Sequence, residues 1–168
     1  MQRILAIGIL LVGCFVLAES AQGQRIGVGA HYWRTVDTLP DGFDRDGLSY
    51  RLTFQNNLSP LLHYQVDIER LPSGYAGADK TVYAPQAMLL MGRWVYGGVG
   101  VGILYSDGDF ADRPFYLVRA GVDISLLPRV RLDINANYHF SEWRGLSEMG
   151  RDIDTDTITI GAALRLAL

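Results

Sequence analysis

Apolar and polar side chains alternate without interruption between Arg129 and Phe140. Neighbouring side chains of a strand point to opposite faces, so this stretch is predicted to be a strand with one apolar and one polar face. Its length is close to the ~9–11 residues with which a tilted strand crosses a bilayer. The apolar face carries Val130, Leu132, Ile134, Ala136, Tyr138 and Phe140, and the polar face Arg131, Asp133, Asn135, Asn137 and His139.

The same alternation predicts further strands before and after this one. The connections between them are alternately long and short, which is typical of an outer-membrane barrel with long outside loops and tight periplasmic turns. The predicted strands cover about 25–33, 48–55, 62–69, 81–91, 95–105, 116–125, 129–140 and 157–168. Long connections are expected at 39–46, 73–79, 107–114 and 141–154, and short ones at 56–60, 92–93 and 127–128.

Tyrosines stand on the apolar face where the predicted strands meet the long loops. A soluble barrel such as a lipocalin has the same period with apolar residues inside. Aromatic residues and long loops at one end favour the membrane arrangement, in which they form the outer interfacial girdle. We therefore predict an all-β fold, an eight-stranded antiparallel up-and-down transmembrane β-barrel. The girdle is expected to contain Tyr32, Tyr50, Tyr83, Tyr105, Tyr116 and Tyr138.

Residues 1–23 do not show the alternation that predicts strands. A short cationic start precedes an apolar run that ends at Ala18, as in a secretory signal peptide. We expect residues 1–23 to be a signal peptide cleaved after Gly23, with Ala18 and Ser20 as alternative cleavage positions, and residues 24–168 to form the barrel. The segment around Cys14 also resembles a lipoprotein processing box, but apolar residues follow this cysteine.

The overall composition excludes two classes of protein. In 168 residues, 15 Lys and Arg are set against 18 Asp and Glu, which gives a net charge of −3. This balance argues against nucleic-acid binding, which needs a basic patch. No internal segment reaches the ~20 apolar residues of a membrane-spanning helix.

The polar face is expected to fill a narrow lumen with charges of both signs that compensate one another. Arg51 is expected to pair with Asp67 and Glu69. A second network is expected from Arg119, Asp123, Arg131, Asp133 and Arg165, and the glycines at 98, 100 and 102 are expected to leave room for these long side chains. Eight strands leave space for little more than side chains, so an open pore is not expected.

With this pattern in hand, the chain resembles the small outer-membrane barrels: the OmpA transmembrane domain, OmpX and Ail, and the opacity-type proteins. The closing stretch Thr157–Leu168 resembles the terminal strand that such proteins present to the barrel assembly machinery, although the family commonly ends in Phe. The resemblance implies a bacterial outer-membrane location, contact with outer-membrane lipid and lipopolysaccharide, insertion by the assembly machinery, and a monomer. It implies no cofactor.

Two groups of residues are candidates for chemistry. His139, Ser141 and Glu148 could form a hydrolytic triad, and the His-x-Ser spacing resembles lipid A deacylases of the PagL type. Alternatively, His139 is one more polar lumen residue. Asp152, Asp154 and Asp156 share one strand face and are candidate calcium ligands, or else solvated loop charges.

The function predicted from sequence is a non-enzymatic surface protein that serves envelope integrity or adhesion through its acidic loops. The alternatives are a lipid A deacylase-like hydrolase that uses His139 and Ser141, and a small porin-like channel.

Overall fold

The structure is a computed structural model of the whole chain. It describes residues 23–36, 45–73, 75, 80–111, 113–140, 142–143, 153–154 and 156–168, with the backbone alone at 142–143 and 153–154. The expected signal peptide, residues 1–23, lies outside these ranges except for Gly23, and stays a prediction. Among the described residues, no helix is long and apolar enough to cross a membrane.

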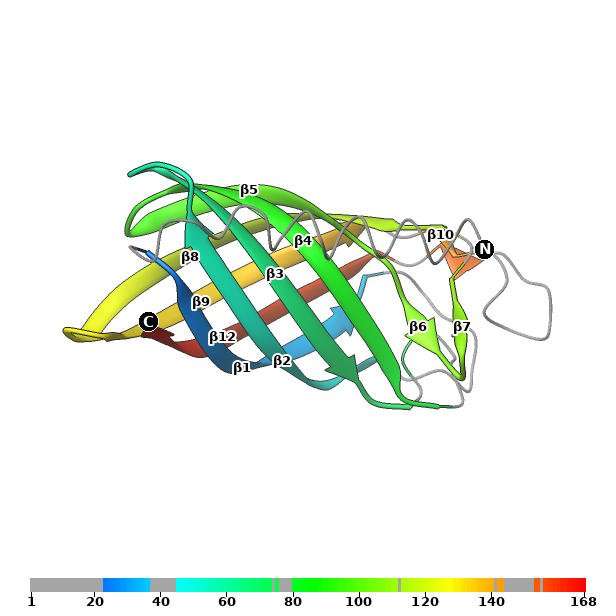
Figure 1. Cartoon of the computed structure of the whole chain (residues 1–168). Helices are drawn as coiled ribbons and strands as arrows, with labels where there is room; N and C mark the ends of the chain where they lie inside the picture. The colour runs from blue at the N-terminus through cyan, green and yellow to red at the C-terminus, as the bar shows by residue number, and fades with distance from the viewer. Residues whose placement is uncertain are drawn as a thin grey trace.

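Eight long antiparallel strands close into a barrel, which confirms the predicted fold (Figure 1). Each strand pairs with its neighbour, and the first pairs with the last, so that no edge is left open. The order around the barrel is β1 (Arg25–Thr35), β2 (Asp46–Asn57), β3 (Leu62–Leu71), β4 (Val82–Gly92), β5 (Val95–Gly102), β8 (Phe115–Leu127), β9 (Val130–Phe140) and β12 (Thr157–Ala167).

The outward face of the barrel is apolar and the inward face holds the charges. On β1, Val28 is 64% exposed whereas His31 is 1% exposed, and the alternation continues around the barrel. A continuous outer band of large apolar side chains has no stable place in water but suits the hydrocarbon of a bilayer. The barrel therefore spans a membrane with its apolar face toward lipid.

The two ends of the barrel differ. Short connections at 58–61, 93–94 and 128–129 join strands at one end, which we call the turn end, and the longer connections lie at the other, the loop end (Figure 1). The turn after β4 requires glycine, because Gly92 has φ +133° and a Cβ there would meet the carbonyl oxygen of Val95 at 2.2 Å. This layout is the expected one.

The strand predicted at 95–105 is shorter than expected. β5 pairs with β4 only as far as Gly102, opposite Gln86. The next residue of β4 is Pro85, which has no N–H to donate to a neighbouring strand. Its carbonyl still accepts a hydrogen bond from the backbone N–H of Ile103, at 3.1 Å, and pairing with β4 resumes at Tyr105, opposite Tyr83.

Short paired strands lie at two of the predicted loops. β6 (Tyr105–Ser106) and β7 (Asp109–Phe110) form a hairpin whose turn residues, Asp107 and Gly108, both have positive φ, the conformation that tight hairpins favour. β10 (Glu142–Trp143) pairs with β11 (Ile153–Asp154) inside the longest predicted loop.

Candidate functional site in the barrel interior

Two carboxylates occupy the centre of the lumen, and the first is Asp67 on β3. Its Oδ2 accepts hydrogen bonds from Arg51 Nη1 at 3.3 Å and from Arg119 Nη1 at 3.0 Å. Its Oδ1 accepts one from Gln65 Nε2 at 2.8 Å. Arg119 lies on β8, so this carboxylate joins non-adjacent strands of the barrel.

The second central carboxylate is Asp133 on β9. Its Oδ2 accepts hydrogen bonds from Arg51 Nη2 at 2.7 Å, Arg165 Nη2 at 2.8 Å and Asn135 Nδ2 at 2.7 Å. The hydroxyl of Tyr96 donates to Oδ1. Arg51 therefore bridges both carboxylates across the lumen. The residues of this single charged network are Arg51, Asp67, Arg119, Asp133 and Arg165.

Glu69, predicted as a partner of Arg51, has other hydrogen-bond partners. His31 Nδ1 lies 3.0 Å from Glu69 Oε1, Gln86 Nε2 donates to Oε2 at 3.2 Å, and the hydroxyl of Ser49 donates to Oε1. His31 Nε2 lies 3.1 Å from Oδ1 of Asn135, which links this group to Asp133.

A separate ion-pair group lies toward the turn end. Asp123 accepts from Arg131 Nε at 2.8 Å and from Arg25 Nη1 at 3.1 Å. The side chain of Arg131 is 19% exposed and that of Asp123 is 4% exposed. The eight predicted lumen charges thus fall into arrangements other than the two expected: Arg51, Arg119, Asp133 and Arg165 belong together, whereas Asp123 and Arg131 stand apart.

The sequence analysis did not name three residues that hydrogen-bond to the interior carboxylates. Arg25 donates to Asp123, His31 lies at hydrogen-bond distance from Glu69, and Tyr96 donates to Asp133. Arg25 begins its strand, whereas His31 and Tyr96 lie between outward-facing residues, so the alternation along the strand was the available signal.

One wall of the interior is apolar, which the expectation of a polar lumen did not include. Every inward residue of β4 except Gln86 is apolar and buried, and so are the first two inward residues of β8. We call these residues the apolar wall: Val82, Ala84, Met88, Leu90, Phe115 and Leu117.

The glycines of β5 make room for the apolar wall, not for the charged side chains. A Cβ at Gly100 would lie 2.4 Å from Cγ of Met88, and one at Gly102 would lie 2.3 Å from the ring of Phe115. A Cβ at Gly98 would lie 2.6 Å from Cδ2 of Leu90. The expectation that these glycines accommodate arginines across the barrel was wrong, because the side chains on the adjacent strands reach them first.

Aromatic residues close the loop end of the interior. The rings of Trp33 and Tyr75 meet edge to face with centroids 4.9 Å apart, and both side chains are buried. Tyr75 comes from the connection between β3 and β4, outside the membrane-spanning strands. Burial raises the pKa of its hydroxyl to about 12. A hydrogen bond from Thr157 opposes this shift, and the charge of Glu69 adds to it.

His139, the candidate catalytic base, points into the lumen. It is 6% exposed, and its ring lies 5.3 Å from that of Phe115. No described residue hydrogen-bonds to its Nε2. Ser141 and Glu148 lie outside the described residues, so the triad stays a prediction.

The acidic candidates are described only in part. Asp152 lies outside the described residues, and of Asp154 only the backbone is described. Asp156 accepts a hydrogen bond from the hydroxyl of Tyr138. Within the described ranges, no group of three or more His, Cys, Asp or Glu residues is placed to hold a metal ion.

The six predicted girdle tyrosines lie near the loop end. Tyr50 and Tyr116 are 59% and 60% exposed on the outward face. Tyr32, Tyr83, Tyr105 and Tyr138 occupy the same end of their strands, and the hydroxyl of Tyr32 donates to Asp46. A smaller aromatic group that was not predicted, Phe54, Tyr64 and Trp94, lies at the turn end.

Comparison with solved structures finds similar chains. Neisserial surface protein A is similar over 89% of this chain and 98% of its own, with a TM-score of 0.66 and 18% identity. The outer membrane protein OprG from Pseudomonas aeruginosa is similar over 87% of this chain and 97% of its own, with a TM-score of 0.49 and 16% identity. No protein-family model matches the chain, and no curated protein sequence matches it. The likeness to Neisserial surface protein A agrees with the fold, an eight-stranded antiparallel β-barrel.

Proposed function

We propose that this chain is a non-enzymatic integral protein of the outer membrane that serves envelope integrity or surface interaction through its loops. The observation that carries the proposal is the network across the lumen, in which Arg51 joins Asp67 to Asp133 from opposite walls. Such a network links opposite strands of the barrel by hydrogen bonds and occupies the space through which a solute would pass. The barrel then acts as a rigid membrane anchor, and the loops perform the role in envelope integrity or surface interaction.

The surroundings of the barrel follow from the same proposal. It is a monomer in outer-membrane lipid and lipopolysaccharide, and β12 is the segment that the barrel assembly machinery recognises. Purified protein should run as one compact species on unboiled SDS gels and shift in mobility on heating. A protein that remains in the soluble fraction after cell lysis would contradict this.

Conductance tests the closed lumen directly. In planar bilayers the pure protein should give no stable, ohmic single-channel current, because the charged network and the aromatic residues at the loop end fill the interior. The porin-like alternative predicts such a current. The Arg51→Ala variant provides a matched measurement, since removal of the bridge between Asp67 and Asp133 should make any residual leak larger.

Lipid A acylation tests the non-enzymatic part of the proposal. Lipid A from cells with and without the protein should carry the same acyl chains. A loss of acyl chains that disappears in Ser141→Ala, but not in the matched hydroxyl variant Ser125→Ala at the turn end, would establish the hydrolase instead.

The role in the envelope is tested in cells. A strain without the protein should admit hydrophobic dyes faster, or attach less to a surface, than its parent. Complementation with the wild-type chain should restore the parental behaviour. Unchanged dye entry and unchanged attachment would contradict both forms of the proposed role.

A further inference from the structure

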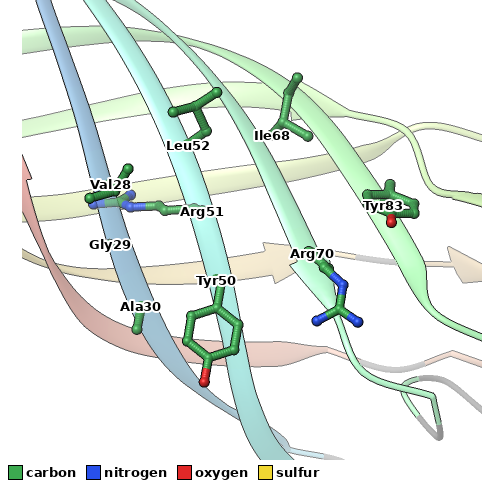
Figure 2. Close-up of a pocket in the computed structure, with 9 residues that line it drawn as sticks. All are labelled: Val28, Gly29, Ala30, Tyr50, Arg51, Leu52, Ile68, Arg70 and Tyr83. Atoms are coloured by element: carbon green, nitrogen blue, oxygen red, sulfur yellow. The ribbon is translucent and has the colours of Figure 1, made fainter.

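A hollow on the outer surface of the barrel combines an apolar floor with a cation at the membrane boundary (Figure 2). Its volume is about 490 Å³, within the range of roughly 300–1,000 Å³ found for small-molecule sites. Val28, Leu52 and Ile68 lie opposite one another on three adjacent strands and line the part nearer the middle of the barrel, and Ala30 lies opposite Tyr50 at the level nearer the loop end. Val28 and Ala30 are short beside the larger side chains of β2 and β3, which leaves a depression over β1.

The loop-end part of the hollow is polar and positively charged. Arg70 stands on β3 directly across from Tyr50 on β2 and from Tyr83 on β4. Figure 2 shows the guanidinium of Arg70 between these two tyrosines, directed away from Leu52 and Ile68. All three side chains are exposed on the outward face. They belong to the band where aromatic residues meet lipid headgroups.

Arg70 lacks a counter-charge among the described residues. No hydrogen bond or ion pair joins its side chain to any described residue, although the lumen arginines are each held by a carboxylate. An arginine fork at a membrane interface matches a phosphate with two parallel hydrogen bonds. The tyrosine hydroxyls on either side supply further donors.

A second hollow of similar size provides an internal comparison. It measures about 470 Å³ and lies over β4, β5, β8 and β9, with Leu89, Val99 and Val118 among its lining residues. None of its lining residues is charged. Ordinary acyl chains can cover such a surface without selection. The hollow with Arg70 differs because it joins a similar apolar surface to one arginine that has no ion-pair partner among the described residues.

We infer that the hollow formed by Val28, Ala30, Leu52, Ile68, Tyr50, Tyr83 and Arg70 binds one phosphorylated lipid of the outer leaflet. Arg70 and the two tyrosines hold the phosphate, and an acyl chain lies over Val28, Ala30 and Leu52. Charge complementarity selects this occupant, since an apolar surface alone accepts any chain. The inference rests on the lipid-facing side of the fold and is independent of the role proposed for the loops.

The test is native mass spectrometry of the full-length protein in a non-ionic detergent, titrated with lipid A. The wild-type protein should bind one lipid A saturably, and dephosphorylated lipid A should bind much more weakly. Arg70→Gln should weaken lipid A binding by about tenfold or more, because a charge-assisted hydrogen-bond pair is lost. Arg70 is exposed, so the variant should retain the heat-dependent gel shift that reports folding.

Two control variants separate the site from general attraction. Arg34→Gln removes another exposed arginine of the loop end, one that lies across from Asp46, and should change binding less than twofold. Ala30→Phe fills the hollow and should weaken lipid A binding while Arg70 remains. Ala136→Phe adds the same ring to the outward face of β9 and should have no effect.

Several outcomes would overturn the inference. Equal losses in Arg70→Gln and Arg34→Gln would show general electrostatic attraction. Inorganic phosphate that displaces lipid A at equal concentration would show that the apolar floor contributes nothing, and a stable dimer that buries Leu52 and Ile68 would show that a second copy covers the hollow. None of these outcomes changes the conductance or the lipid A acylation that test the proposed function. Failure of the lipid site can therefore be distinguished from failure of the proposed function.

Discussion

Two walls of the same interior are stabilised by different physics. The charged network has Arg51 and Asp133 with side chains at 0% exposure, joined by one 2.7 Å hydrogen bond across the lumen. The apolar wall, on β4 and the start of β8, has Leu90 at the same 0% exposure and no polar group except Gln86 on β4. Side chains are equally buried in the charged network and in the apolar wall. A substitution leaves an uncompensated charge in the first and a cavity in the second.

The difference lies in how each wall responds to loss of one member. Removal of a carboxylate leaves buried arginines without compensation, and their desolvation cost is then no longer offset. Removal of an apolar side chain leaves a cavity, whose cost depends on how far the neighbours can relax. The charged network is thus cooperative across strands, and the apolar wall responds locally.

The largest effect is expected from Asp133→Ala. This change leaves both Arg51 and Arg165 without one of their acceptors and frees the hydroxyl of Tyr96. Loss of one partner of a buried pair typically costs ~3–5 kcal/mol of unfolding free energy. Urea unfolding in detergent, followed by the gel shift, measures this loss.

An exposed carboxylate is the control for this prediction. Asp107, whose side chain is 67% exposed beside Lys80, should lose less than about 1 kcal/mol on change to Ala. Equal losses at Asp133 and Asp107 would mean that the lumen charges are solvated, and the contrast between the two walls would disappear.

Leu90→Ala tests the apolar wall and should cost ~2–5 kcal/mol, as is usual when a buried leucine is truncated. The loss should stay local, because the residue opposite Leu90 on β5 is Gly98, whose backbone is fixed by the barrel. The Leu90→Met variant keeps the volume and should cost less than about 1.5 kcal/mol. If Leu90→Met proved as costly as Leu90→Ala, shape and not cavity formation would control this wall.

The fold follows from the sequence because strand geometry imposes a period of two. Residues such as Val130 and Ile134 identify the outward face without reference to any other part of the chain. β4 is harder to assign, because Met88 and Leu90 are apolar on the inward face while Leu89 is apolar on the outward face. Gln86 was the one residue that distinguished the two faces there.

The pairings inside the lumen could not be predicted from the alternation of inward and outward residues. This alternation assigns a residue to a face of its strand, but it gives neither the depth of the residue along the barrel nor its neighbour across the lumen. Arg51 and Asp133 are 82 residues apart and meet only after the barrel closes. For the same reason Asp67 and Asp133 were placed in two separate networks, although Arg51 joins them.

A smaller effect is expected at the turn end, where Asp123 has two arginine partners. Arg131→Ala should cost about 1–3 kcal/mol, the usual range for a hydrogen bond to a charged group, because Arg25 still compensates the carboxylate. The double variant Arg25→Ala with Arg131→Ala should cost more than the sum of the single variants, since Asp123 is then left without a cation. Strict additivity in this double-mutant cycle would contradict the shared carboxylate.

The smallest effect concerns the aromatic residues that close the loop end. Burial raises the pKa of Tyr75 from 10.0 to about 12, so the folded protein holds this hydroxyl in its neutral form while the unfolded chain ionises it more easily. The stability that depends on the neutral form is complete below pH 10.0 and declines as the pH rises toward about 12. Unfolding midpoints of the wild type should therefore fall across this interval more steeply than those of Tyr75→Phe, which has no hydroxyl to ionise. Parallel pH profiles for the two proteins would show that Tyr75 meets solvent in the folded state, and that the loop end of the barrel is open.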